Sequence, residues 1–424
     1  MHDPVSYYRA SARPFPSLPP LAGDAATDVC VVGAGYTGLA SALFLRRAGL
    51  RVVVLESERV GFGASGRNGG QVTGGQRRDV DWMEAHLGKS LAHELWALGN
   101  ESRDLVKSLV HELAIDCDLT PGIATVAHRA RYVPDYHRLV DKLTGDYDAA
   151  NLEKLDADAA AALLGTRAFF GGYVDWDAAH LHPLNLALGI AQHALDLGVV
   201  VHERSRVSGF EERGGKVHVT TPTGSVTADH LVLATNGYLG KLAPALAGRI
   251  MPINNFMVAT APLDPARLDR INPRRVATAD SRFVIDYFRT SSDGRLLFGG
   301  GENYRRGFPR DIASFVRPYL LRIYPDLADV PIEYAWGGTL AITMNRMPHI
   351  GRLSSRVYFA QGYSGHGVAL AHLAGKVIAE AIRGSGERFD VFGRIRIRRF
   401  PGGRWLRWPG LVLGMTYFAL RDRL

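Results

Sequence analysis

The chain has 424 residues, of which 46% are hydrophobic and 22% charged, as is ordinary for a globular protein with two or three domains. No apolar run reaches ~18 residues and only two cysteines occur, which argues against a spanning helix, a disulfide framework and a zinc site. The net charge is +8, but residues 391–424 hold eight arginines and one acid, so the rest of the chain carries only +1 and we expect no nucleic-acid surface on it.

The N-terminal twenty residues lack the basic and then apolar pattern of a secretory signal. Cys30 and Cys117 are too few to suggest an oxidising compartment. We therefore expect a cytoplasmic protein without a metal site.

A βαβ unit is predicted for "DVCVVGAGYTGLASALFLRRAGLRVVVLES", which starts at Asp28. The apolar run Val29–Val32 indicates a buried strand, and residues 39–48 have helical spacing closed by Gly49. "RVVVLE" indicates a second buried strand, which ends at Glu56. This is the context in which a glycine-rich turn binds a dinucleotide.

The turn inside this unit has the pattern G-x-G-x-x-G at Gly33, Gly35 and Gly38. Such glycines allow a tight turn, close approach of the backbone to a pyrophosphate, and close helix–strand packing. The N-terminus of the following helix supplies free N–H groups for the phosphates. Glu56 follows Gly33 by 23 residues and suits the ribose hydroxyls. The unit predicts a dinucleotide but leaves NAD and FAD both open.

The stretch "GFGASGRNGGQ" at residues 61–71 favours FAD, because nicotinamide enzymes need no such segment there. We expect Ser65 to donate to a phosphate, and Arg67 and Asn68 to reach phosphate or ring edge. Gly69 and Gly70 leave space for the ring face. The alternative is a flexible surface loop, against which the apolar residues within the stretch argue modestly.

At this point the sequence resembles the FAD-dependent amine and D-amino-acid oxidoreductases, the family that includes glycine oxidase and sarcosine oxidase. Within that family it is most similar to the bacterial γ-glutamylputrescine oxidases. The resemblance spans nearly the whole chain. Besides the βαβ unit with "ERVGFGASGRNGGQ", it is carried by "HLHPLNLALG", "LVLATNGYLG", "RLLFGGG", "YAWGGTLAITMNRMPHIGRL", "QGYSGHGVALAHLAGKVIAEAIRG" and "RFPGGRWLRWP".

We expect an α/β fold in which a Rossmann-like FAD-binding domain is interleaved with an α+β substrate domain built on a mostly antiparallel sheet. One or two helices are predicted for residues 81–115, a helix for 183–198, and a hairpin within 283–301. The predicted parts of the FAD-binding domain are 1–85, 179–248 and 336–390, those of the substrate domain are 86–178 and 249–335, and residues 391–424 form a basic, apolar tail.

A second glycine-rich loop before a helix is predicted at "QGYSGHGVALAHLAGKVIAEAI". The backbone N–H groups of Gly365, His366 and Gly367 could stabilise the negative charge of a reduced flavin, and the resemblance implies the same position. His366 is also a candidate base. The interpretation that we favour is that it only packs beside the ring or donates to it.

The predicted site residues combine the motifs with the resemblance, which adds the short loop at residues 235–237. Catalytic or cavity-lining candidates, each of which could equally belong to the core, are His366, Tyr287, Arg289 and Trp336, with Phe256 and Tyr363. The predicted FAD-binding residues are Gly33, Gly35, Tyr36, Thr37, Gly38, Glu56, Ser57, Gly63, Ala64, Ser65, Gly66, Arg67, Asn68, Gly69, Gly70, Gln71, Val207, Thr235, Asn236, Gly237, Gly338, Gly362, Tyr363, Ser364, Gly365, His366, Gly367 and Val368.

Two departures from the family pattern bear on the chemistry. Relatives with covalent flavin use a cysteine in the segment matching residues 334–351, which has none here, so we expect non-covalent FAD. Some relatives place a lysine above the flavin in the strand matching residues 295–301, where this chain has leucines. That difference leaves room for a dehydrogenase that passes electrons to an acceptor other than O2.

The function that the resemblance implies is oxidative deamination of an amine by hydride transfer to flavin N5, giving imine, aldehyde, ammonia and H2O2. It implies γ-glutamylputrescine or a similar acylated diamine as the substrate. Alternatives are an amine or amino-acid dehydrogenase with another acceptor, and a flavin enzyme acting on a tRNA-linked amine. For the tail we expect docking on the body or on a second subunit rather than peripheral contact with a membrane.

Overall fold

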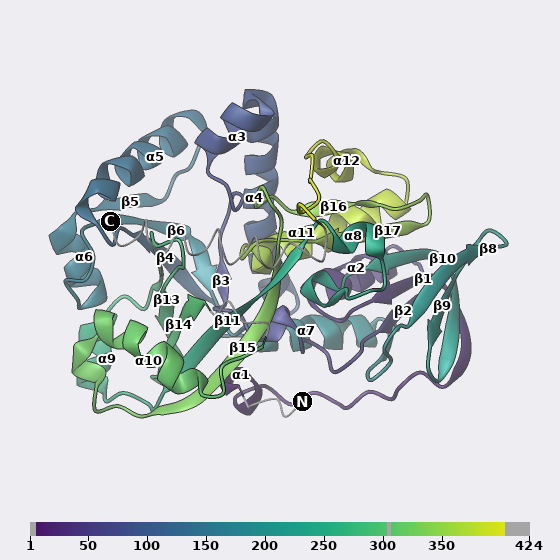
Figure 1. The fold of residues 1–424 in the computed structure, drawn as a ribbon, viewed down its shortest axis with the longest axis horizontal. Coiled ribbons are helices and arrows are strands. Elements are labelled where there is room, and N and C mark those ends of the chain that lie inside the picture. Colours follow the sequence, from purple (N-terminus) through teal and green to yellow (C-terminus); the bar gives the residue numbers. More distant parts are fainter. Residues whose placement is uncertain (1–5, 303–306, 403–424) are drawn as a thin grey trace.

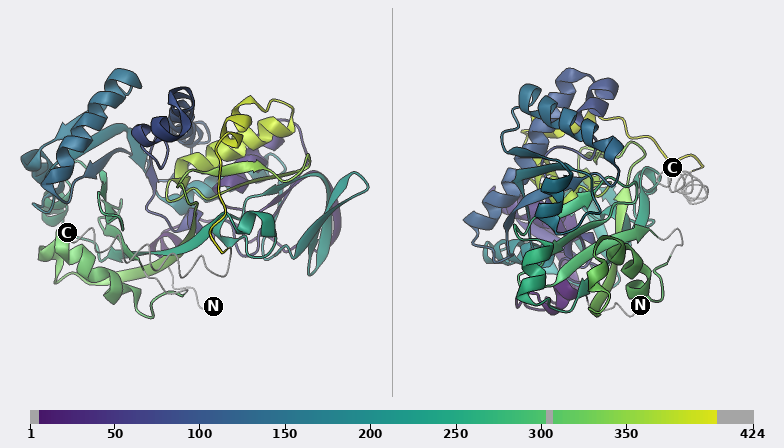
Figure 2. Two further views of the ribbon diagram at one scale, coloured as in Figure 1. Left: turned by 45° about the horizontal axis from the view of Figure 1, so that its top comes forward. Right: turned by 90° about the vertical axis from the view of Figure 1, so that its left-hand side faces the viewer.

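The computed structural model describes residues 6–302 and 307–402. Two β-sheets with their helices form two lobes that lie side by side (Figures 1 and 2). Most of the tail, including its tryptophans, lies outside the described residues, so the docking prediction for residues 403–424 stays a prediction.

The first sheet has a central parallel part in the order β16-β17-β10-β1-β2-β7. Only β16, at the edge of this part, runs antiparallel to its neighbour. Strands β8 and β9 form a hairpin that pairs with β10 through β9 and projects from the lobe (Figure 1). The bounds are β1 Gly23–Val32, β2 Val52–Leu55, β7 Val200–His202, β8 Gly209–Arg213, β9 Lys216–Thr221, β10 Gly224–Leu233, β16 His349–Arg352 and β17 Val357–Gln361.

The second half of β1, from Val29 to Val32, is buried on both faces, as its apolar sequence predicts. Val29 and Val31 face the core shared with helices α2 (Tyr36–Arg47) and α11 (Gly367–Ile382). Cys30 and Val32 face a second core on the opposite side of the sheet. Alternation of side chains along a strand places successive residues in different cores. The sequence needs continuous apolar runs here because helices or strands cover both faces.

The second sheet has nine strands in the order β15-β11-β14-β13-β12-β4-β6-β3, with β5 paired to β6. Its neighbouring strands are antiparallel except for the pair β4 and β12. The predicted mostly antiparallel sheet is thus confirmed. The bounds are β3 Gln71–Val72, β4 Thr120–Val126, β5 Leu152–Leu155, β6 Gly172–His180, β11 Met251–Thr260, β12 Ala277–Asp280, β13 Tyr287–Thr290, β14 Leu296–Glu302 and β15 Ile332–Ile342.

The chain passes back and forth between the two sheets, which confirms the interleaved fold class. Strands β1 and β2 belong to the first sheet, β3 to β6 to the second, β7 to β10 to the first, β11 to β15 to the second, and β16 and β17 to the first. The predicted domain boundaries stay predictions. Strands β6 and β15 cross the predicted boundaries at residues 178 and 335, and β3 joins the second sheet although it lies within the predicted residues 1–85.

Helices complete both lobes. The predicted helical region 81–115 forms α3 (Val80–Leu87) and α4 (Lys89–Glu112), which are divided at Gly88, where φ is +86°. Helix α4 packs on α11, and α11 packs closely on α2. The remaining longer helices are α5 Val133–Asp146, α6 Ala157–Leu164, α7 Pro183–Asp196, α9 Pro265–Ile271, α10 Ile312–Ile323 and α12 Glu387–Gly393.

The part of the tail that the structure describes packs on the body of the protein. Ile395 and Ile397 are buried in the core that α2 and α11 share. Arg394 pairs with Glu94 on α4 at 2.8 Å, and the Phe400 amide donates to the Gly248 carbonyl at 2.9 Å. Residues 394–400 are therefore part of the folded domain.

Candidate active site

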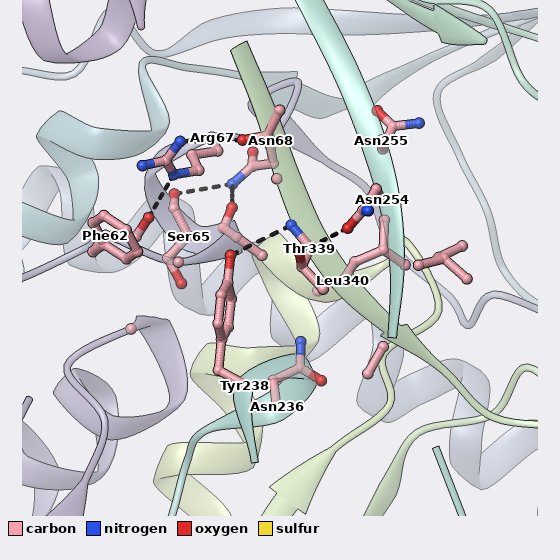
Figure 3. Close-up of a pocket in the computed structure, with 18 of the residues that line it drawn as sticks. Phe62, Ser65, Arg67, Asn68, Asn236, Tyr238, Asn254, Asn255, Thr339 and Leu340 are labelled. Atoms are coloured by element: carbon pink, nitrogen blue, oxygen red, sulfur yellow. Dashed lines mark hydrogen bonds between the residues drawn. The ribbon is translucent and has the colours of Figure 1, made fainter. Parts of the chain in front are cut away.

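A cavity of about 1860 Å³ lies between the two sheets. On one side it is lined by the ends of β2 and β10 and by the starts of α2 and α11. On the other side it is lined by β11, β13 and β15 and by residues 62–71, which pass between the sheets. Figure 3 shows Phe62, Ser65, Arg67 and Asn68 beside the strand that carries Thr339, with Asn254 on the neighbouring strand. The carboxyl ends of parallel strands are where open α/β sheets bind ligands.

The first glycine-rich turn has the geometry that its sequence predicts. Gly33 has φ +107°, and a Cβ there would lie 2.8 Å from the Ala234 carbonyl oxygen. A Cβ on Gly38 would lie 1.8 Å from the Gly33 carbonyl oxygen, so helix and strand require glycine to pack this closely. Gly35 is the N-cap of α2 and has no side chain to close the helix end. The N-terminus of α2 thus opens onto the cavity with backbone donors and a positive dipole end.

Glu56 follows β2 at the wall of the cavity. One of its carboxylate oxygens accepts from the Ala34 amide at 2.8 Å, and the other accepts from the Glu58 amide at 2.9 Å. Burial raises the pKa of this carboxyl group, and the two backbone bonds oppose that rise. A carboxylate held this way keeps further lone pairs that can accept from ribose hydroxyls.

Residues 61–71 form a hydrogen-bonded turn rather than a loose loop. Asn68 donates to the Ala64 carbonyl at 2.9 Å, and its own side-chain oxygen accepts from the Gly70 amide at 2.7 Å. Arg67 donates to the Gly337 carbonyl on β15 at 3.1 Å, and its guanidinium lies 4.7 Å from the Phe62 ring centroid. Arg67 and Asn68 line the cavity, and these bonds hold the shape of the segment as well.

The loop after β10 and the loop before α11 meet at the wall of the cavity. Asn236, with φ +42°, accepts from the Gly362 amide at 2.9 Å, which joins the loop after β10 to the loop before α11. Tyr363 and Thr37 share a hydrogen bond of 2.6 Å between their hydroxyls, which ties the starts of α11 and α2 together. Gly365 has φ +92°, is exposed, and has open space around its Cβ position. The uncapped start of α11 therefore presents backbone donors at the cavity.

The structure brings most of the predicted FAD-binding residues to this one cavity. Those predicted residues that do not line it are Gly38, Gly66, Gly70, Gly237, Gly362 and His366. Those that do are Gly33, Gly35, Tyr36, Thr37, Glu56, Ser57, Gly63, Ala64, Ser65, Arg67, Asn68, Gly69, Gln71, Val207, Thr235, Asn236, Gly338, Tyr363, Ser364, Gly365, Gly367 and Val368.

Three of the candidate catalytic or cavity residues belong to the packing instead. Trp336 is fully buried, and its Nε1 donates to the Arg67 carbonyl at 3.0 Å. Phe256 is also fully buried and packs against Phe315. Both residues lie on strands that line the cavity elsewhere along their length, but their own side chains point into the core.

Arg289 is the third. Its guanidinium donates to the Gly69 carbonyl at 3.0 Å and to the Leu181 carbonyl at 2.9 Å, and it is 3% exposed. It fastens the glycine-rich segment to the end of β6 and does not line the cavity. Tyr287, by contrast, lines the cavity, and its hydroxyl donates to the Asn255 side-chain oxygen.

His366 lies behind the cavity wall. Its Nε2 is 3.0 Å from the Gly74 carbonyl oxygen, and its ring nitrogens also contact the Thr73 hydroxyl. Burial, aided by the nearby Arg77, lowers the pKa of His366 to about 4. The ring is therefore neutral near pH 7 and donates to the backbone behind the wall, so the expected contact of His366 with the flavin ring stays a prediction.

Several cavity residues escaped the sequence analysis. Asn254 and Asn255 stand in β11, where two consecutive amides inside an apolar strand were a signal for a polar wall. Arg77 and Arg346 gave no signal, because isolated arginines are common on surfaces. Those that line the cavity without having been predicted include Arg77, Ile253, Asn254, Asn255, Phe283, Ile285, Phe308, Thr339, Leu340 and Arg346.

The described parts of the chain contain no helix that is long and apolar enough to cross a membrane. Within the same residues, no group of three or more His, Cys, Asp or Glu side chains is arranged to hold a metal ion.

The residues present fit FAD. Two helix starts whose N-cap residues form no side-chain cap face one cavity, a carboxylate stands at the end of β2, and a Cβ on Gly35 would lie 2.8 Å from Ser65 Oγ, so a side chain at the first turn would displace Ser65. Such an arrangement suits a phosphate-bearing dinucleotide with a ring at its far end.

Comparisons with known proteins agree with this geometry. The model of the FAD dependent oxidoreductase (DAO) family matches residues 28–381. The chain is 41% identical to gamma-glutamylputrescine oxidoreductase of Escherichia coli K12, covering 99% of this chain and 98% of that protein. It is 40% identical to a probable oxidoreductase, OrdL, of Rhizobium meliloti, over 99% of this chain and 97% of that one.

Solved structures share the fold. The crystal structure of glycine oxidase from Geobacillus kaustophilus superimposes with a TM-score of 0.75 at 20% identity, over 89% of this chain and 99% of that chain. L-proline dehydrogenase from P. horikoshii gives a TM-score of 0.71 at 20% identity, over 89% and 100%. The chain belongs to the DAO family of FAD-dependent oxidoreductases.

Proposed function

We propose that this enzyme oxidises the primary amine of γ-glutamylputrescine or of a similar acylated diamine, and releases an aldehyde and ammonia. The observation that carries the proposal is the 41% identity to the Escherichia coli gamma-glutamylputrescine oxidoreductase over essentially both full lengths. The size of the cavity supports it. At about 1860 Å³, the cavity exceeds the ~300–1,000 Å³ of common ligand pockets, which leaves space for an extended substrate beside a dinucleotide.

FAD, when bound, supplies the acceptor for the hydride that leaves the carbon bearing the amine. The residues of the chain orient the substrate. Tyr287 and Asn255 form a hydrogen-bonded pair on the wall made by β13 and β11, and Asn254 stands next to them. Amide and phenol groups can hold a neutral amine and an amide linkage without adding charge. The imine that results is hydrolysed by water.

The neutral amine is the reacting form, because hydride transfer from an ammonium would leave a doubly charged product. No catalytic base is needed if the substrate arrives deprotonated. His366 is neutral and behind the wall, in keeping with such a mechanism. The rate should then rise with pH as the substrate ammonium loses its proton.

For the electron acceptor we propose O2, which would give H2O2, and we keep a different acceptor as the alternative. Leu296 and Leu297 of β14 are both fully buried in apolar cores, so neither offers a cation at the cavity. The absence of a cation at these two positions is the reason for keeping the dehydrogenase alternative. The assay that decides is H2O2 release by the isolated holoenzyme on a panel of amines, compared with reduction of an artificial acceptor.

The cellular compartment, the position of the tail and the binding partners are proposals as well. Cys30 and Cys117 are buried free thiols, which suits a reducing compartment such as the cytoplasm. The docked residues 394–400 favour a tail held on the body. A nucleic-acid partner is not part of the proposal, and an oligomer is compatible with it.

A further inference from the structure

Two neighbouring arginines between β3 and α3 have different environments. Arg78 donates to the Asn345 carbonyl at 3.0 Å, and its guanidinium lies 4.9 Å from the Trp82 ring centroid. Arg77 is partly buried and lines the cavity, as does Arg346. Of the adjacent pair, therefore, only Arg77 lines the cavity.

The surroundings of Arg77 are cationic. Burial, together with the charges of Arg346 and Arg78, lowers the pKa of Arg77 to about 10, and Asp79 opposes this only weakly. Within the described residues, no carboxylate forms an ion pair with its guanidinium. A partly buried cation beside others of like charge is costly unless an anion pairs with it.

Each carboxylate that lines the cavity lies at the first turn or caps a helix. Glu56 and Glu58 stand after β2 at the first turn. Asp311 is the N-cap of α10, where it accepts from the Ser314 amide at 2.9 Å and from the Ser314 hydroxyl at 2.6 Å. An anion opposite Arg77 must therefore come from a bound molecule.

We propose that Arg77, with Arg346 beside it, binds a carboxylate of the substrate. The planar guanidinium offers paired N–H donors that match a carboxylate. This inference rests on the proposed function and deepens it: the enzyme selects acylated diamines whose acyl group carries a carboxylate. The same two cations repel a free diamine, because its second ammonium has no neighbouring carboxylate, whereas the α-ammonium of a γ-glutamyl group has one. Discrimination thus combines attraction of one substrate with rejection of another.

The test compares Arg77→Met and Arg77→Lys with the matched control Arg78→Met, all as holoenzymes. Steady-state kinetics are measured with γ-glutamylputrescine, with N-acetylputrescine, which lacks the carboxylate, and with putrescine. We expect Arg77→Met to lose at least about tenfold in kcat/KM for γ-glutamylputrescine, mainly through KM. N-acetylputrescine should change less than about twofold, putrescine should improve, and Arg77→Lys should recover part of the loss. Arg78→Met should behave as the wild type.

Binding without turnover gives a second measurement. γ-Glutamylpropylamide keeps the carboxylate but lacks the oxidisable amine, and calorimetry on the holoenzyme gives its Kd. Arg77→Met should weaken this binding by the same factor as KM, while the Kd for FAD on reconstitution stays unchanged. Equal losses on γ-glutamylputrescine and N-acetylputrescine, an unchanged Kd for the propylamide, or a loss of FAD affinity would each overturn the assignment. If the wild type oxidises none of the three amines, the proposed function fails, and the calorimetric comparison alone decides the carboxylate site.

Discussion

Gly35→Ala should weaken FAD binding more than it weakens the fold. The added Cβ would lie 2.8 Å from Ser65 Oγ, and that hydroxyl accepts from the Tyr36 amide at 3.0 Å. Ser65 can rotate away, at the cost of this bond, which is about 1 kcal/mol. The backbone of Gly35 itself is unstrained for alanine, because its φ is −89°.

The methyl group also stands where the start of α2 must approach the phosphates of the dinucleotide. A misfit of one carbon in a packed site costs about 1–3 kcal/mol, which corresponds to a rise in the Kd for FAD of roughly fivefold to 150-fold. The assay is quenching of flavin fluorescence during reconstitution of the apoprotein, with urea unfolding as a measure of stability.

Gly49→Ala is the matched control. Gly49 has φ +88° and no atom within 4 Å of its Cβ position, so alanine there adds backbone strain of about 1–2 kcal/mol without a clash. We expect this control to lose stability and to keep the affinity for FAD. Gly35→Ala with wild-type affinity, or Gly49→Ala with an equal loss of affinity, would refute the assignment of the first turn to the cofactor.

Three further predictions concern the core, the pH response and the attachment of the cofactor. Trp336→Phe removes one buried hydrogen bond, so urea unfolding should show a loss of about 1–3 kcal/mol while kcat changes little; a tenfold drop in kcat at unchanged stability would restore Trp336 to the active site. Burial lowers the pKa values of His366 and His372 to about 4, whereas unfolded histidines titrate near 6.5, so the unfolded state takes up protons first and stability falls as pH drops from about 6.5 towards 4. The melting temperature should thus be lower at about pH 5 than at about pH 7.5, and the reverse order would contradict this burial. Cys30 and Cys117 are buried and do not line the cavity, so acid precipitation should leave the yellow colour in the supernatant rather than in the pellet.

The fold could be predicted from the sequence because its signals are local. The strand, turn and helix from Asp28 to Glu56 each follow from apolar runs and glycine positions. The interleaving came from the resemblance over the whole chain, since periodicity alone does not say which sheet a strand joins. The extent of β3 and β15 depends on long-range pairing, which a boundary drawn from sequence does not capture.

The cofactor side of the site was easier to predict than the substrate side. Dinucleotide binding uses backbone at fixed glycine spacings, which sequence displays directly. The substrate wall depends on which face of a strand points inward, and a shift of one residue exchanges core for cavity. Asn255 therefore lines the cavity while its neighbour Phe256 is buried. In the loop between β3 and α3, Arg77 lines the cavity while Arg78 does not.

Anaerobic mixing of the holoenzyme with γ-glutamylputrescine tests the central claim most directly, because it separates substrate oxidation from the choice of electron acceptor. The account predicts that the visible absorption band of the flavin bleaches, and that it does so faster than with glycine, sarcosine or a D-amino acid. Faster bleaching by one of those amino acids would contradict the substrate assignment. No bleaching by any amine would contradict amine oxidation itself.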